Sequence, residues 1–231
     1  MAKIGIGLDI GTSSVKIVEL EKSRDIKVNR FGIFPLPEGA LNGGVVKDVS
    51  EVGKVIRDVY QTLKIKQRKG VVAIAGQSVI VRHLKMPKMS KEELANALHW
   101  EAERYIPFSI DEVNMDFDII GEFEDSIEVM LVCAHNDIVY SHLRALDEAG
   151  VRPLSMDIQP FALMRAVGLE NSKSETNVAL LDIGAGTADL TIVKGGIPRF
   201  TRIVPVAGNN LTNNISNQLG ISFDEAESAK I

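Results

Sequence analysis

Two short segments, far apart in the chain, share a residue pattern that is suited to binding phosphate. The first runs Leu8-Asp9-Ile10-Gly11-Thr12-Ser13-Ser14, and the second runs Leu181-Asp182-Ile183-Gly184-Ala185-Gly186-Thr187. Glycine in a tight turn leaves backbone N–H groups free to converge on an anion, and the neighbouring hydroxyls add further donors. Turn chemistry alone could explain one such hairpin. Two matched copies in one chain indicate a duplicated phosphate site.

Charged residues in these segments indicate which phosphate compound is bound. Asp9 and Asp182 precede the turns, where a bare phosphate would be repelled. A hydrated Mg²⁺ between carboxylates and phosphates removes this conflict, because Mg²⁺ keeps several waters and binds few protein groups directly. Lys16 on the return strand could reach the same phosphates as a point charge. The sequence therefore predicts ATP with Mg²⁺ as the ligand.

The expected contacts divide into two groups. Those to the phosphates come from Asp9, Gly11, Thr12, Ser13, Ser14, Lys16, Gly184, Ala185, Gly186, Thr187 and Gly208. Asp9 and Asp182 are expected to hold Mg²⁺ through water, and no metal site built from protein ligands alone is expected. The four histidines are scattered, and His135 and His142, two helical turns apart, are too distant to share one ion.

Hydrophobic spacing predicts the elements that position these loops. Strands are expected at residues 4–10, 15–20, 28–34, 71–75, 79–84, 113–120, 127–134, 154–158, 178–193 as a hairpin, and 200–204. Helices are expected at 50–63, 90–105, 136–149, 160–167 and 209–219, and another begins after 222. Asp48 or Ser50 can cap the first helix, and Ser90 with Glu93 forms a capping box for the second. The pattern is that of an α/β fold interrupted by a helix-strand-strand-helix block.

Composition restricts the class of protein and its surroundings. The chain has 231 residues, 45% of them hydrophobic, with a formal net charge of -5. No basic stripe stands out, so a nucleic acid is not expected as a partner. Cys133 is the only cysteine, which excludes an internal disulfide and fits a reducing compartment. The longest apolar runs are strand-sized, so any membrane connection is expected to pass through a partner.

With both loops identified, the sequence resembles the actin-like ATPases, which include actin, sugar kinases and the bacterial division protein FtsA. The interrupting block, with Met86 to Ser90, Glu92 to Leu94 and Glu101 to Phe108 followed by Asp111 to Val113 and Asp116, is similar to the PilM family of type IV pilus assembly proteins. The resemblance implies an actin-like (ribonuclease H-like duplicated) fold with an inserted α+β subdomain. It places the first lobe at 1–85 and 150–175, the insert at 86–149 and the start of the second lobe at 176–231.

The resemblance also implies a water-orienting residue. Asp157-Ile158-Gln159-Pro160 occupies the first connecting segment, where the superfamily commonly has a carboxylate or amide that orients the attacking water. Asp157 and Gln159 alternate, so only one of them can face the cleft, and Gln159 is the preferred candidate. Hydrolysis is expected to be slow or absent.

As implied by the same resemblance, the partner is the cytoplasmic N-terminal tail of the inner-membrane protein PilN. The tail would lie in the groove between the first lobe and the insert, which places the protein in the cytoplasm, at the inner membrane through its partner. Other inner-membrane and motor components of the pilus machine are further expected partners. In the insert, Leu94, Ala97, Leu98, Glu101 and Tyr105 share a helix face that is expected to pack on the insert's own sheet. Trp100 lies off that stripe and is a candidate for a partner surface.

Two alternatives stay open on this fold, an FtsA-like division protein and a small-molecule kinase. The kinase would need a catalytic aspartate beside a substrate pocket, and the sequence offers no separate candidate. Members of the family continue well past the second loop, so an incomplete second lobe without the adenosine-binding glycine segment is expected. Such a lobe should expose apolar surface, which predicts self-association into a homo-oligomer.

Overall fold

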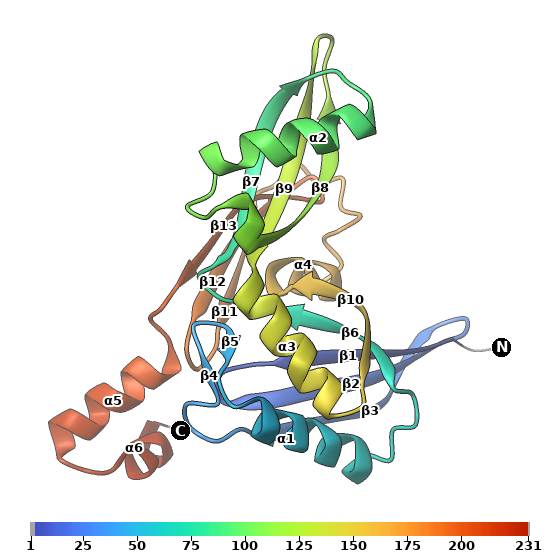
Figure 1. Ribbon diagram of the computed structural model, residues 1–231. Coiled ribbons are helices and arrows are strands. Elements are labelled where there is room, and N and C mark those ends of the chain that lie inside the picture. Colours follow the sequence, from blue (N-terminus) through green and yellow to red (C-terminus); the bar gives the residue numbers. More distant parts are fainter. Residues whose placement is uncertain (1–2, 231) are drawn as a thin grey trace.

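A computed structural model describes residues 3–230 and arranges them as two lobes and an insert (Figure 1). The first lobe occupies the lower part of the view, and the insert rises above it. The sheet of the second lobe ascends beside the insert, and its two helices lie at the lower left. Within residues 3–230, no helix is both long and apolar enough to span a membrane.

The first lobe is built on a five-stranded sheet in the order β10-β6-β1-β2-β3. Its strands are β1 (Lys3–Ile10), β2 (Ser14–Lys22), β3 (Ile26–Pro35), β6 (Lys69–Ile74) and β10 (Arg152–Ile158). β1 pairs in parallel with β6, and β6 pairs in parallel with β10. Because the carboxyl ends of parallel strands meet at one edge of a sheet, the segments that follow these three strands are brought together there.

Helices α1 (Val49–Thr62) and α3 (Asn136–Glu148) cover one face of this sheet. The strand predicted at residues 4–10 is confirmed, with Ile6, Leu8 and Ile10 buried in the core on this side and Ile4 50% exposed. Asp48 caps α1, with its side chain accepting a 2.9 Å hydrogen bond from the backbone N–H of Glu51. Ser50, the other candidate for the cap, lies inside the helix.

The insert is a three-stranded sheet in the order β7-β9-β8, covered by α2 (Lys91–Glu101). Its strands are β7 (Val79–Pro87), β8 (Val113–Glu122) and β9 (Ser126–His135). The predicted capping box is confirmed: Ser90 N–H donates to Glu93 Oε2 at 2.8 Å, and Glu93 N–H donates to Ser90 Oγ at 3.2 Å. Leu94 and Leu98 pack on this sheet as predicted, whereas Trp100 is 80% exposed.

Strand pairing bears on where the insert begins and ends. β7 pairs with β9 along its whole length from Val79, and α3 packs mainly against α1 of the first lobe. The boundaries at residues 86 and 149 stay a prediction, and these contacts favour an insert of about residues 79–135. The spacing of hydrophobic residues could not show which sheet residues 79–84 join, because the partners of a strand lie far away in the sequence.

The second lobe contains an antiparallel sheet in the order β11-β12-β13 and two helices. The strands are β11 (Val178–Ile183), β12 (Ala188–Lys194) and β13 (Ile197–Val204), and the helices are α5 (Gly208–Leu219) and α6 (Phe223–Lys230). Helix α4 (Gln159–Ala166) follows β10 directly, within the segment that joins the two lobes. The predicted second hairpin is therefore confirmed, and it repeats the β1–β2 hairpin of the first lobe.

Two local features differ from the prediction. A small hairpin of β4 (Leu41–Asn42) and β5 (Val45–Val46) was not predicted, because its strands are too short to show a period. The helix predicted to reach residue 105 ends at Glu101 and continues as a 3₁₀ turn over Ala102–Arg104. A second 3₁₀ turn spans Ile110–Glu112, just before β8.

Candidate functional site

The two glycine loops are built in the same way. In the first, Gly11 N–H donates to the Ser14 carbonyl at 3.0 Å, and in the second, Gly184 N–H donates to the Thr187 carbonyl at 2.9 Å. Asp9 and Asp182 occupy corresponding places, each at the penultimate position of its strand. The sequence repeat thus corresponds to a structural repeat, with one hairpin in each lobe.

The two loops touch each other at Gly186. A Cβ atom on Gly186 would lie 2.6 Å from Thr12 Oγ1, which is closer than real contacts allow. Any side chain at this position would therefore push the hairpins apart, since it would meet Thr12 before the loops could reach their present separation. The two lobes can therefore approach this closely only with glycine at position 186.

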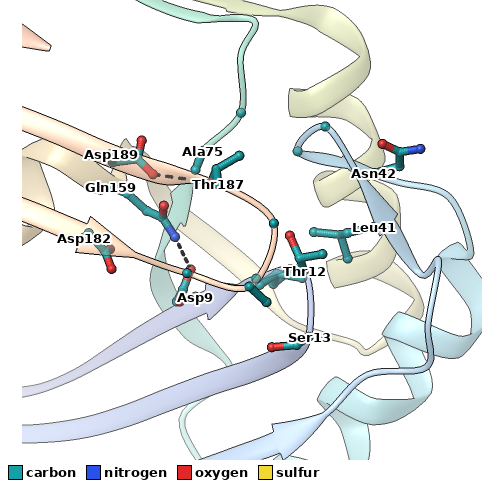
Figure 2. A pocket seen from close by; sticks show the side chains of 18 of the residues that line it. Asp9, Thr12, Ser13, Leu41, Asn42, Ala75, Gln159, Asp182, Thr187 and Asp189 are labelled. Atoms are coloured by element: carbon teal, nitrogen blue, oxygen red, sulfur yellow. Dashed lines mark hydrogen bonds between the residues drawn. The ribbon is translucent and has the colours of Figure 1, made fainter. Parts of the chain in front are cut away.

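A cavity of about 220 Å³ lies between the hairpins (Figure 2). Figure 2 shows Asp9, Gln159, Asp182 and Asp189 on one side of it, with Thr12 and Ser13 on the loop beside them. Most of the predicted site residues line this cavity: Asp9, Gly11, Thr12, Ser13, Lys16, Gln159, Asp182, Gly184, Ala185, Gly186 and Thr187. The structure therefore brings the two halves of the predicted site together.

Three predicted residues are not among those that line the cavity. Ser14 has a buried side chain, and its carbonyl accepts the turn hydrogen bond from Gly11. Gly208 N–H donates to the Gly184 carbonyl at 3.0 Å, so it supports the second loop from behind. Asp157 pairs with Arg165 and faces two neighbouring grooves. These residues hold the loops and the connecting segment in the structure described here.

Gln159 and Asp157 therefore have different hydrogen-bond partners. Gln159 Nε2 donates to Asp9 Oδ1 at 2.8 Å, which ties the connecting segment to the first loop (Figure 2). Asp157 Oδ1 accepts from the backbone N–H of Ile158 at 2.8 Å. Of the two candidates for orienting water, Gln159 is the one that lines the cavity.

Sequence reasoning missed two segments of the cavity wall, Leu41–Gly44 and Ala75–Gln77. They pack backbone against backbone: a Cβ on Gly44 would lie 2.1 Å from the Ala75 carbonyl oxygen, and one on Gly76 would lie 2.6 Å from the Gly43 carbonyl oxygen. Gly44 and Gly76 also have positive φ angles of 88° and 141°. The signal available in the sequence was the Asn42-Gly43-Gly44 run, which is typical of a two-residue hairpin turn.

The cavity is acidic at one side and rich in free N–H groups at the other. Its lining includes three carboxylates, from Asp9, Asp182 and Asp189, and one cation, Lys16, whose Nζ lies 2.9 Å from Asp9 Oδ2. Among the described residues, the N–H groups of Thr12, Ser13, Ala185 and Gly186 donate no hydrogen bond within the protein. An anion could accept from these donors, and a divalent cation would offset the carboxylates.

The donor set fits a hydrated ion better than a directly bound one. Across residues 3–230, no three His, Cys, Asp or Glu side chains gather closely enough to hold a metal ion. Mg²⁺ binds through few carboxylates together with phosphate oxygens and water. Asp9 and Asp182, one from each hairpin, are therefore the residues that would hold it, with water completing the contact.

A second contact joins the second lobe to the insert, and we call it the clasp (Arg199, Glu128, His83). Arg199 Nη1 donates to both carboxylate oxygens of Glu128 at 3.1 Å, and His83 Nδ1 lies 3.3 Å from Glu128 Oε1. His83 Nε2 also lies 2.7 Å from the Pro198 carbonyl oxygen. Burial works against the charge of Glu128, but the hydrogen bonds from His83 and Arg199 outweigh it and lower its pKa.

A groove of about 180 Å³ lies between the insert and the first lobe, and we call it the insert groove. Phe117, Met130 and Val132 line it from the insert, and Met156 and Phe161 from β10 and α4. Carboxylates lie beside this apolar floor, from Asp116, Asp118 and Asp157. The groove is at the place where the family resemblance predicts that a peptide binds.

Comparisons with known proteins agree with this architecture. The family described as type IV pilus assembly protein PilM matches residues 7–231. A chain in the solved PilM-PilN type IV pilus biogenesis complex is 30% identical with a TM-score of 0.90, over 98% of this chain and 68% of that one. MreB5 of Spiroplasma citri bound to ADP has a TM-score of 0.51 at 16% identity, over 99% of this chain and 61% of that one. The chain therefore has the actin-like ATPase fold.

Among curated relatives, the cell division protein FtsA of Bacillus subtilis (strain 168) is 25% identical over 252 residues. The match covers 97% of this chain and 57% of that protein. The chain thus spans less than three-fifths of the length of this relative. The likeness to MreB5 concerns the fold alone.

Proposed function

Because the chain belongs to the family of type IV pilus assembly protein PilM, we propose that it is a nucleotide-dependent scaffold of the pilus machine. In this role it binds the cytoplasmic N-terminal tail of PilN and anchors the inner-membrane complex from the cytoplasmic side. Nucleotide acts as a conformational ligand, because it contacts both lobes and so favours one arrangement of them. Other inner-membrane and motor components would dock on the same scaffold.

One observation carries the nucleotide part of the proposal: two equivalent loops from different lobes face one cavity with their N–H groups unused. This arrangement suits a phosphate tail that lies between the lobes. Asp9 and Asp182 would hold hydrated Mg²⁺, which supplies charge to offset the phosphates, and Lys16 would add a second positive charge. The fold relative MreB5 was solved with ADP, which is consistent with this ligand class.

The insert groove supports the peptide part of the proposal. The solved chain with a TM-score of 0.90 comes from a PilM-PilN complex. An apolar floor lined by Met130, Val132 and Phe161 suits an extended peptide with large apolar side chains. Asp116 and Asp118 beside it would favour a peptide that also carries Lys or Arg.

The testing experiment is a calorimetric titration of the purified chain with a synthetic PilN-tail peptide, with and without Mg·ATP. We expect saturable binding of the peptide and an affinity that changes when Mg·ATP is present. Met130→Ser should weaken peptide binding about tenfold or more, because it removes a large apolar contact from the groove. Trp100→Ala is the matched control, since this aromatic side chain is exposed on the insert outside the groove.

Nucleotide binding is tested in the same titration with Mg·ATP alone. Lys16→Ala should weaken it about tenfold, the usual effect of removing one charge-assisted contact to phosphate. Gln159→Ala should leave the affinity within about threefold while reducing any slow hydrolysis, since Gln159 is proposed to orient water. A folded chain that binds no PilN-tail peptide would instead favour the division-protein or kinase alternatives, and a kinase would show ATP consumption stimulated by sugars.

A further inference from the structure

Helix α3 connects the insert directly to the nucleotide cavity. β9, the central strand of the insert, ends at His135, and α3 begins at Asn136 without a linker. His135 caps the helix, because its Nδ1 accepts from the Asp137 N–H at 3.2 Å. Figure 1 shows α3 running from the insert to the first lobe as a continuation of β9. The insert and α3 are therefore joined without a flexible segment between them.

Ser141, in the middle of α3, holds one wall of the cavity. It is fully buried, and its Oγ accepts a hydrogen bond from the Val46 N–H at 3.1 Å and donates one to the Ile138 carbonyl at 3.0 Å. Val46 belongs to the β4–β5 hairpin, whose turn at Gly43 and Gly44 lines the cavity. The position of this wall therefore depends on the position of α3.

His142, the next residue, lies beneath the first phosphate loop. It is 1% exposed, and its Nδ1 lies 2.9 Å from the Ile138 carbonyl oxygen. Its Nε2 is buried and makes no hydrogen bond with the described residues, although the Ile10 backbone lies close enough to act on the ring. Ile10 stands between Asp9 and Gly11, so the ring supports the loop at its base.

The protonation state of His142 decides which of its ring nitrogens can donate. Burial lowers the pKa of the ring, and the Ile138 backbone, the charge of Asp9 and the Ile10 backbone oppose this effect only in part. The ring is therefore neutral near pH 7 and carries a single N–H. Because a carbonyl oxygen only accepts, this N–H is at Nδ1 and donates to Ile138, and Nε2 faces the base of the loop without a proton.

We propose that Ser141 and His142 are positioning residues that fix the β4–β5 hairpin and the first phosphate loop on α3, so that ligands in the insert groove and in the nucleotide cavity affect each other's binding. The proposal rests on the proposed function, because it needs both ligands. It adds the structural element through which they are coupled. Neither side chain lines the cavity or the insert groove, so their effect must pass through the backbone that they hold.

The first test separates the two sides of the His142 ring. His142→Gln keeps a polar group at the Nε2 position, toward Ile10, and His142→Asn keeps one only at the Nδ1 position, toward Ile138. His142→Asn should weaken Mg·ATP binding about tenfold, because it leaves empty the space that the ring fills next to the Ile10 backbone, whereas His142→Gln should stay within about threefold of the wild type. Equal affinities for the two variants would overturn the role of His142 at the loop.

Leu146→Ala is the matched control for loss of packing. Leu146 is fully buried one turn further along α3 and belongs to the core of the first lobe. Leu146→Ala should lower the melting temperature at least as much as His142→Asn while leaving Mg·ATP affinity within about threefold, because the leucine side chain has no polar atom that could hold the backbone of the loop. A loss of nucleotide affinity equal to that of His142→Asn would show that the effect is one of stability, and would overturn the proposal.

The second test measures coupling, as the ratio of PilN-tail affinity with and without Mg·ATP. Ser141→Ala and His142→Asn should bring this ratio close to one while binding of the peptide alone stays near the wild-type value. An unchanged ratio in both variants would overturn the proposal and leave the proposed function intact. A wild-type chain that binds neither ligand would instead contradict the proposed function, and this inference with it.

Discussion

Asp189 is 6% exposed at the start of β12, and burial, followed by the charge of Asp182, raises its pKa to about 6. Thr187 Oγ1, at 3.4 Å from Oδ2, opposes this shift only weakly, and Oδ1 has no partner among the described residues. The ionised carboxylate of Asp189 therefore destabilises the folded state, which is a free-energy cost. A cation in the cavity would reduce this cost, which is consistent with the proposed Mg²⁺.

Replacing Asp189 by Asn should stabilise the chain at pH 7 in the absence of Mg²⁺. The folded pKa of about 6 is above the ordinary value of 3.8, so the folded state binds more protons and this group favours folding increasingly as pH falls from 6 to 4. The stabilisation by Asn at pH 7 should be on the order of 1–3 kcal/mol, and the difference should vanish below about pH 4. Thermal unfolding of both proteins across pH 4–8 measures it.

A difference between the two proteins that does not change with pH would contradict this account of Asp189. Glu93 provides a contrast, because its pKa is lowered by hydrogen bonds from the backbone and side chain of Ser90. Its contribution to stability is present above its ordinary pKa and is lost as pH falls. The two groups therefore act in opposite directions on stability in acid.

At the scale of elements, the clasp and the contact between Thr12 and Gly186 hold the second lobe against the rest of the molecule at separate places. The clasp joins β13 to β7 and β9, whereas the loops meet at the cavity. Arg199 and Glu128 are both partly exposed, so their ion pair contributes little to overall stability. Its effect should be on the arrangement of the lobes.

Arg199→Ala should leave the free energy of unfolding within about 1 kcal/mol and increase the separation between the insert and the second lobe. Spin labels on cysteines introduced at Glu92 and Gln218, both exposed, would report the distance distribution. We expect a broader distribution with a longer mean. The native Cys133 is buried and should label slowly.

Arg202→Ala is the matched control for this experiment. Arg202 lies on the same strand, is exposed, and makes no ion pair among the described residues. Its distance distribution should match that of the labelled parent. If the two arginine variants gave the same distribution, the clasp would have no role in setting the arrangement of the lobes.

At the scale of the whole molecule, two apolar surfaces are exposed. On the first-lobe sheet, Phe31 and Ile33 are 72% and 67% exposed, and on the second hairpin Leu181 and Ile183 are exposed to a similar extent. Phe31 and Ile33 also line an apolar hollow on the sheet. Surfaces of this kind favour association, in agreement with the self-association predicted from the sequence.

The chain should therefore self-associate as its concentration rises, and sedimentation velocity over a hundredfold range would detect this. A double variant, Phe31→Ser with Ile33→Thr, should shift the onset to higher concentration, because it removes apolar area from one surface. A monodisperse wild-type monomer over the whole range would contradict the prediction.

The sequence alone determined the features that depend on neighbouring residues. The two glycine hairpins, the Ser90 capping box, the packing stripe of α2 and the approximate end of α3 all follow from propensities and short-range hydrogen bonds. The identity of most loop residues that line the cavity followed as well, since each loop is a continuous segment. The repeat was visible because both copies keep the same order of residues.

The tertiary structure decided which distant segments meet. Gln159 lines the cavity and Asp157 does not, because β10 ends where α4 begins and Asp157 pairs with Arg165. The Gly43 and Gly76 segments join the cavity wall through backbone contacts, which the spacing of hydrophobic residues does not reveal. The sheet to which β7 belongs, the clasp, and the support of the first loop by α3 likewise depend on contacts between residues far apart in the chain. Such contacts form only when the whole chain is packed, so local sequence patterns could not predict them.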